Sequence, residues 1–122
     1  MLNDCLHALA HAHARDLIHR DIKPANVLIR QGTLGAQYVL TDFGIAHAAE
    51  RQTRTFGSDQ TASSHEDASG TPHYMSPEQF TGLWRDYGPW TDLYALGIVA
   101  WELMTGTPPF RGSNVVMVGL ML

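Results

Sequence analysis

The sequence is poor in cysteine, in lysine and in long apolar runs. Its one cysteine, Cys5, excludes an intrachain disulfide and fits a reducing compartment, so we expect a cytoplasmic protein. Its one lysine, Lys23, is accompanied by seven arginines. The apolar stretches Ala95–Met104 and Val115–Leu122 are shorter than the roughly 20 residues that a membrane-spanning helix needs, and no secretory signal follows Met1. We therefore expect no membrane segment in this chain.

The charge balance is not that of a protein that binds polyanions. The formal net charge is −4, whereas nucleic acids and anionic lipids are bound by basic surfaces. We therefore expect no nucleic-acid partner. With 122 residues, of which 44% are hydrophobic, the chain is long enough for one domain with a core and too short for two.

The first half of the sequence predicts a helix followed by a small β hairpin. Apolar residues recur at helical spacing over residues 2–15, and this helix is expected to end near Asp16, which tolerates the left-handed backbone conformation. Strands are predicted over Val27–Arg30 and Tyr38–Thr41, joined by a glycine-containing turn at Gln31–Ala36. The predicted fold class is mainly α with this one hairpin.

The second half combines a polar stretch with an apolar helix. Glu50–Gly70 is rich in Ser, Thr, Gln, Asp and Gly, which predicts a long loop or an interdomain linker. Ser76-Pro77-Glu78 predicts a turn into a short helix. Residues 91–104 predict a helix that is apolar on nearly every face, which is typical of a central, buried helix. Ser113 or Asn114 could cap one last helix.

Three short motifs follow one another in a set order. His19–Asn26 reads HRDIKPAN, Asp42–Gly44 reads DFG directly after a predicted strand, and Ser76–Glu78 reads SPE. Each is weak alone, but together, with a hairpin between the first two, they resemble the protein kinase family over essentially the whole chain. Lys23, two residues after Asp21, resembles the lysine found at this place in the Ser/Thr class of kinases. The sequences of Asp21–Leu28 and Tyr94–Phe110 are similar to those of bacterial members.

The resemblance implies a part of the large, C-terminal lobe of a kinase domain. Residues 1–122 would run from the helix before the catalytic loop, 19–26, through the activation segment, 42–78, to the start of the helix after a central helix at about 91–104. The small N-terminal lobe and the last large-lobe helices would be absent. We therefore expect the 91–104 helix to leave apolar surface exposed.

The chemistry of the motif residues fits phosphoryl transfer with ATP and Mg²⁺ as cofactors. Such a reaction needs positioning and charge neutralisation. Asp21 is the candidate acceptor of the substrate proton, and Lys23 the cation beside the moving phosphoryl group. Asn26 and Asp42 offer the oxygen ligands that Mg²⁺ prefers. The resemblance also places Leu28 among the cofactor-binding residues.

Further residues have regulatory or structural roles by resemblance. Arg20 would pair with a phosphorylated activation-loop residue. His19 would pack in the core and bond the backbone, and Phe43 and Gly44 complete the DFG turn. The substrate groove would be shaped by Thr71. The candidate phosphorylation sites are Thr53, Thr55, Ser58, Thr61, Ser63, Ser64 and Ser69.

Two carboxylates and a histidine pair admit simpler interpretations. Asp92 either caps its helix or, by resemblance, anchors the catalytic-loop backbone. Glu78 is either a surface carboxylate or, as in kinases, the partner of an arginine far downstream. His7 and His11 lie four residues apart, a spacing that can hold a metal, but a half-exposed helix face is the preferred interpretation.

The nucleotide-gripping features of the family are missing from the sequence. There is no G-x-G-x-x-G, and Lys23 leaves no second lysine to hold the α- and β-phosphates. Three hypotheses follow: a fragment of a Ser/Thr kinase that acts on protein Ser/Thr hydroxyls but is inactive alone, a non-catalytic pseudokinase-type binding or regulatory module, or a half-enzyme completed in trans. The partners would be a protein substrate and a separate small lobe or a kinase dimer partner.

Overall fold

The computed structural model describes residues 1–33, 35–43, 72–82 and 84–110. The elements are α1 (Leu2–His13), β1 (Val27–Gly32), β2 (Gly35–Leu40), α3 (Pro77–Thr81) and α4 (Pro89–Thr105), with single 3₁₀ turns at Pro24–Asn26, Pro72–Tyr74 and Trp84–Asp86. Over these ranges the expectation of a mainly α fold with one antiparallel hairpin is confirmed. No helix in these ranges is both long and apolar enough to cross a membrane.

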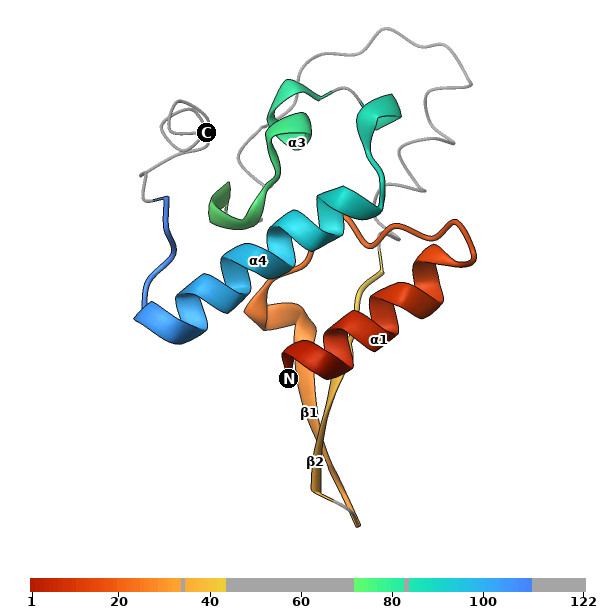
Figure 1. The fold of residues 1–122 in the computed structure, drawn as a ribbon, viewed down its shortest axis with the longest axis vertical. Helices are drawn as coiled ribbons and strands as arrows, with labels where there is room; N and C mark the ends of the chain where they lie inside the picture. Colours follow the sequence, from red (N-terminus) through yellow and green to blue (C-terminus); the bar gives the residue numbers. More distant parts are fainter. Residues whose placement is uncertain (34, 44–71, 83, 111–122) are drawn as a thin grey trace, which may run out of the picture.

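The helices α1 and α4 form the body of the fold, and the hairpin extends away from it (Figure 1). The core is a cluster of apolar side chains from α1, the segment between α1 and β1, β2 and α4: Cys5, Leu9, Ile22, Leu40, Ala95, Leu96 and Val99. The segment between α1 and β1 therefore crosses the core beside α4. This crossing is what positions the polar residues described below.

Helix α1 ends as its sequence predicts. Asp16 adopts the left-handed conformation with φ of 56°. The amide of Leu17 then donates to the carbonyl of Ala12 at 3.1 Å, and the amide of Asp16 donates to His13 at 3.0 Å. These are the two hydrogen bonds of a Schellman motif, which satisfies the last carbonyls of a helix. The chain turns sharply here toward His19.

The hairpin turn is shorter than predicted. Gln31 pairs with Ala36 and Gly32 with Gly35, so the two strands continue through most of the segment expected to be a turn. Gly35 accommodates the reversal with φ of 115°, a conformation open to glycine. The predicted turn at 31–36 is therefore wrong in extent, because the backbone ladder needs no apolar side chains to continue.

Helix α4 is only partly buried. Ala95, Leu96 and Val99 are at most 5% exposed, whereas Leu103 and Met104 are 57% and 77% exposed. The expectation of exposed apolar surface on this helix is confirmed. The predicted loop at 50–70 and the helix cap at Ser113 or Asn114 lie outside the described residues.

Candidate active site

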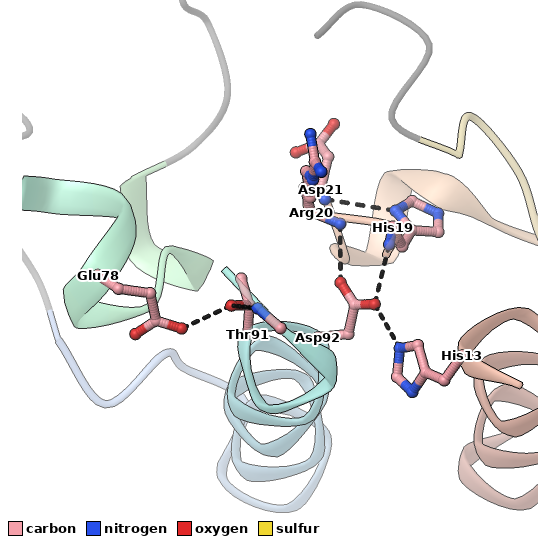
Figure 2. A network of polar contacts seen from close by, with 8 residues as sticks. His13, His19, Arg20, Asp21, Glu78, Thr91 and Asp92 are labelled. Carbon is pink, nitrogen blue, oxygen red and sulfur yellow. Dashed lines mark hydrogen bonds and ion pairs between the residues drawn. The ribbon is translucent and has the colours of Figure 1, made fainter. Parts of the chain in front are cut away.

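One buried carboxylate organises the loop that carries the HRD motif. Asp92 of α4 is 0% exposed. Its Oδ2 accepts the backbone N–H of His19 at 2.9 Å, and its Oδ1 accepts that of Arg20 at 2.7 Å. Its Oδ2 also lies 2.7 Å from Nε2 of His13, at the end of α1 (Figure 2). Because a carboxylate only accepts hydrogen bonds, the His13 ring must be the donor.

The His19 side chain is a buried connector. Its Nε2 donates to the carbonyl of Thr41 at 2.8 Å, and its Nδ1 accepts the backbone N–H of Asp21 at 3.3 Å. Phe43 packs against the ring, with centroids 4.5 Å apart. Since Nδ1 accepts in this arrangement, Nε2 is the ring nitrogen that donates. His19 thus links the HRD loop to the DFG segment.

The Asp21 carboxylate is held by two neighbours and remains reachable from solvent. Its Oδ2 accepts from Nδ2 of Asn26 at 3.0 Å and lies 2.8 Å from Nζ of Lys23. The side chain of Asp21 is 46% exposed, whereas that of Lys23 is 19% exposed. Nδ2 of Asn26 also donates to the Asp21 carbonyl at 2.7 Å. The three residues therefore form one oriented cluster, with a carboxylate that a hydroxyl could approach.

The residues predicted to bind Mg²⁺ come from neighbouring backbone segments. The backbone N–H of Thr41 donates to the carbonyl of Asn26 at 2.9 Å. Asp42 is the next residue after Thr41, so this hydrogen bond holds its backbone segment beside that of Asn26. Asp42 is exposed and left-handed, with φ of 60°. Among the described residues, both hydrogen bonds of the Asn26 side chain use Nδ2, so its amide oxygen could serve a metal.

This donor set fits a magnesium ion shared with phosphates. Within the described ranges, no group of three or more His, Cys, Asp or Glu residues could hold a metal ion. Mg²⁺, however, is usually held by one or two carboxylates together with substrate phosphates and water. An amide oxygen and a carboxylate on adjoining segments meet that requirement.

The comparisons with known proteins agree with this geometry. A family model described as "Protein kinase domain" matches residues 1–119. The chain belongs to the protein kinase domain family. It is 40% identical over 121 residues to the serine/threonine-protein kinase PrkC of Bacillus subtilis, covering 98% of this chain and 16% of that protein.

Other bacterial kinases are similarly related. The chain is 43% identical over 113 residues to the serine/threonine-protein kinase PkaA of Streptomyces coelicolor, covering 91% of this chain and 19% of PkaA. It is 40% identical over 120 residues to the serine/threonine-protein kinase PknA of Mycobacterium tuberculosis, covering 98% and 25%. The chain thus spans a quarter or less of the length of these relatives.

Of the remaining residues for which the sequence predicted a role, some lie in the described part of the chain and others do not. Gly44, Thr71 and every candidate phosphorylation site lie outside the described residues. Leu28 of β1 is 56% exposed. The helix-cap interpretation of Asp92 is wrong, because α4 begins at Pro89 with Gly88 as its N-cap.

Glu78 has a partner within the described residues that the sequence did not indicate. The Thr91 hydroxyl donates to its Oε1 at 2.6 Å (Figure 2), while the amide of Gly88 donates to the same hydroxyl at 3.2 Å. Burial acts to raise the pKa of Glu78, but hydrogen bonds, chiefly from Thr91, outweigh it and lower the pKa. The hydroxyl relay thereby joins α3 to the start of α4.

Sequence reasoning also missed two long-range pairs. His13 lies within the helix predicted over residues 2–15, and nothing in the sequence marked it as the partner of Asp92. The Tyr74 hydroxyl donates to the Glu102 carboxylate of α4. Burial, this hydrogen bond and the charge of Glu102 raise the pKa of Tyr74. For the contact between His13 and Asp92, the only signal in the sequence was a histidine on the apolar face of a predicted helix.

Proposed function

We propose that residues 1–122 supply the catalytic loop and the metal-binding aspartate of a serine/threonine protein kinase. They would form part of its large lobe, with the catalytic loop at 19–26 and the activation segment at 42–78. The reaction transfers the γ-phosphoryl group of ATP to a Ser or Thr hydroxyl of a protein. The observation that carries the proposal is the exposed Asp21 carboxylate, fixed by Asn26 and Lys23.

Each residue of the cluster has one role in the proposed reaction. Asp21 accepts the hydroxyl proton as the new oxygen–phosphorus bond forms and the bond to the β-phosphate oxygen breaks, releasing ADP. Lys23 offsets charge on the moving phosphoryl group. Asn26 and Asp42 would hold Mg²⁺, which neutralises phosphate charge when it is bound. Leu28 contributes exposed apolar surface for the nucleotide.

Regulation by activation-loop phosphorylation is part of the proposal. The Arg20 guanidinium carbon lies 5.8 Å from the centre of the Tyr87 ring. Its Nε is buried with no hydrogen-bond partner among the residues that the structure describes. A phosphate on a Ser or Thr of the activation segment would give this cation an acceptor.

We further propose that these 122 residues alone do not transfer phosphate. They contain neither a G-x-G-x-x-G loop nor a second lysine to hold the α- and β-phosphates. A cytoplasmic location fits the use of ATP and the reduced, buried Cys5. The partners would be a Ser/Thr protein substrate and a nucleotide-gripping lobe.

A replacement chimera tests the proposal. Residues 1–122 replace the aligned segment of Bacillus subtilis PrkC, and transfer of labelled phosphate to a Ser/Thr-containing protein is measured. We expect transfer by the chimera and a loss of roughly 10²–10⁴-fold in Asp21→Ala. Asp86→Asn, an exposed change outside the cluster, is the matched control. A folded chimera with no transfer would support the non-catalytic, pseudokinase-type module instead.

Calorimetry with Mg-ATP distinguishes a fragment from a half-enzyme. We expect no measurable binding by the isolated 122-residue chain. Binding that is lost in Asp42→Ala would instead indicate a competent half-site that a separate small lobe completes in trans.

A further inference from the structure

Arg20 is held in an unfavourable backbone conformation immediately before the proposed catalytic base. Its φ is 70°, in the left-handed region that non-glycine residues rarely adopt. Such a residue persists only when its surroundings fix it from more than one side. Asp92 fixes one side, by accepting the Arg20 N–H at 2.7 Å. The other side, the Arg20 carbonyl, lies on the peptide bond that leads to Asp21.

That carbonyl is bonded by a glutamine from another segment. Nε2 of Gln79 donates to the Arg20 oxygen at 2.7 Å, across 59 residues of sequence. The oxygen of the same amide makes its hydrogen bonds at the start of α3. Oε1 of Gln79 accepts the backbone N–H of Ser76 at 3.0 Å and lies 3.3 Å from the Ser76 hydroxyl.

The oxygen and the nitrogen of the Gln79 amide make two different hydrogen bonds, with different requirements for the side chain at this position. The bond from Ser76 to Oε1 is half of a capping box, in which glutamate and glutamine at the third helical position serve equally. The bond to Arg20 needs an N–H donor, which glutamate at neutral pH lacks. Helix capping alone therefore does not require an amide at position 79, whereas the link to the catalytic loop does.

We propose that Gln79 is a positioning residue of the phosphoryl-transfer site. It holds Arg20 in the left-handed conformation from the carbonyl side, and so ties the orientation of Asp21 to the placement of α3. This inference rests on the proposed kinase function. It makes the end of the activation segment and the catalytic loop move as one unit.

Amide hydrogen exchange on the 122-residue chain tests the link without any enzymatic activity. In Gln79→Glu we expect the amides of Arg20 and Asp21 to exchange roughly tenfold faster, the change expected for one lost hydrogen bond. The Ser76 amide should stay protected, because the carboxylate still caps α3. In Gln79→Ala both regions should exchange faster. Unchanged exchange at Arg20 and Asp21 in Gln79→Glu would overturn the proposal.

Kinetics in the PrkC chimera separate positioning from a merely structural role. We expect Gln79→Glu to lower kcat by about tenfold while KM for ATP is unchanged, since only the orientation of Asp21 is altered. Loss of stability alone would lower the amount of active protein. It would not speed hydrogen exchange of the Arg20 amide relative to exchange of the Ser76 amide. An inactive wild-type chimera would contradict the proposed function, whereas the exchange experiment would still decide the role of Gln79.

Discussion

The His13 imidazole and the Asp92 carboxylate lie 2.7 Å apart, although 79 residues separate them in sequence. Their contact joins the last turn of α1 to the first turn of α4. The same carboxylate accepts the backbone N–H groups of His19 and Arg20. A buried charge is stable only when such donors surround it. One fully buried side chain therefore fixes two helices and the HRD loop relative to each other.

Replacing Asp92 by asparagine should destabilise the chain. The amide offers one acceptor oxygen where the carboxylate has two, so either the His19 or the Arg20 amide loses its partner. We expect a loss of about 2–4 kcal/mol in the free energy of unfolding, measured by urea denaturation. Asp86→Asn, at an exposed site, should change it by less than about 0.5 kcal/mol. Equal effects of the two variants would contradict the anchoring role of Asp92.

Replacing His13 by alanine should remove the third donor to Asp92. We expect a loss of about 1.5–3 kcal/mol, the range for hydrogen bonds to charged groups, measured in the same way. His13→Gln keeps an N–H donor and should recover part of it. His7→Ala, on the exposed face of the same helix, is the control and should be nearly neutral. A His13→Ala effect no larger than that of His7→Ala would argue against the contact.

Replacing Thr91 by valine should change how stability depends on pH. Valine has a similar shape but cannot donate to Glu78 or accept from Gly88. We expect a loss of about 1–2 kcal/mol at pH 7, measured by urea denaturation. Thr81→Val, at an exposed α3 hydroxyl, serves as the control.

The sign of the pH effect follows from the lowered pKa of Glu78. A carboxyl whose pKa is lower in the folded state contributes stability above its unfolded pKa, here 4.5. That stability disappears as the pH falls through the folded value. The difference between wild type and Thr91→Val should therefore shrink between pH 5 and acidic pH, to roughly half or less of its neutral value. A difference that is constant with pH would exclude Glu78 as its cause.

Replacing Asp16 by glycine should stabilise the chain slightly. Asp16 has φ of 56° and an exposed side chain, so glycine relieves backbone strain and removes no buried contact. We expect a gain of about 0.5 kcal/mol, seen as a rise in Tm. Asp16→Ala, which tolerates this conformation less well, should lower Tm. A lower Tm in the glycine variant would mean that Asp16 makes a favourable contact in the folded state.

Local patterns predicted most of the elements that the structure contains. Helical spacing of apolar residues identified α1, an apolar run over 91–104 identified α4, and the composition around Val27–Leu40 identified the hairpin. The hairpin turn was predicted too long, because Gly32 and Gly35 are typical turn residues and yet pair with each other in the ladder, as Gln31 does with Ala36. The residue types in a segment indicate whether it tolerates a reversal of the chain. The backbone hydrogen bonds between the two strands determine where the reversal occurs.

The candidate site was predictable where its residues stand close together, and where the family resemblance supplied a distant partner, as for Asp92 and the backbone of His19 and Arg20. Asp21, Lys23 and Asn26 lie within six residues of one another, so their motif could be recognised as a unit. The contacts of Gln79 with Arg20, and of His13 with Asp92, span 59 and 79 residues. Nothing in the identity of a single glutamine or histidine indicates which distant group it will meet.

The sequence by itself determined which chemical groups the motifs present and the identity of the main elements, because residue type and short spacing set acidity, charge and hydrophobic periodicity. Only the tertiary structure decided which polar groups meet. Packing of Leu9, Ile22 and Val99 into one core brings Asp92 beneath the HRD loop. Each contact in that network depends on the path of the whole chain, since a hydrogen bond forms only when two distant segments reach the same few ångströms of space.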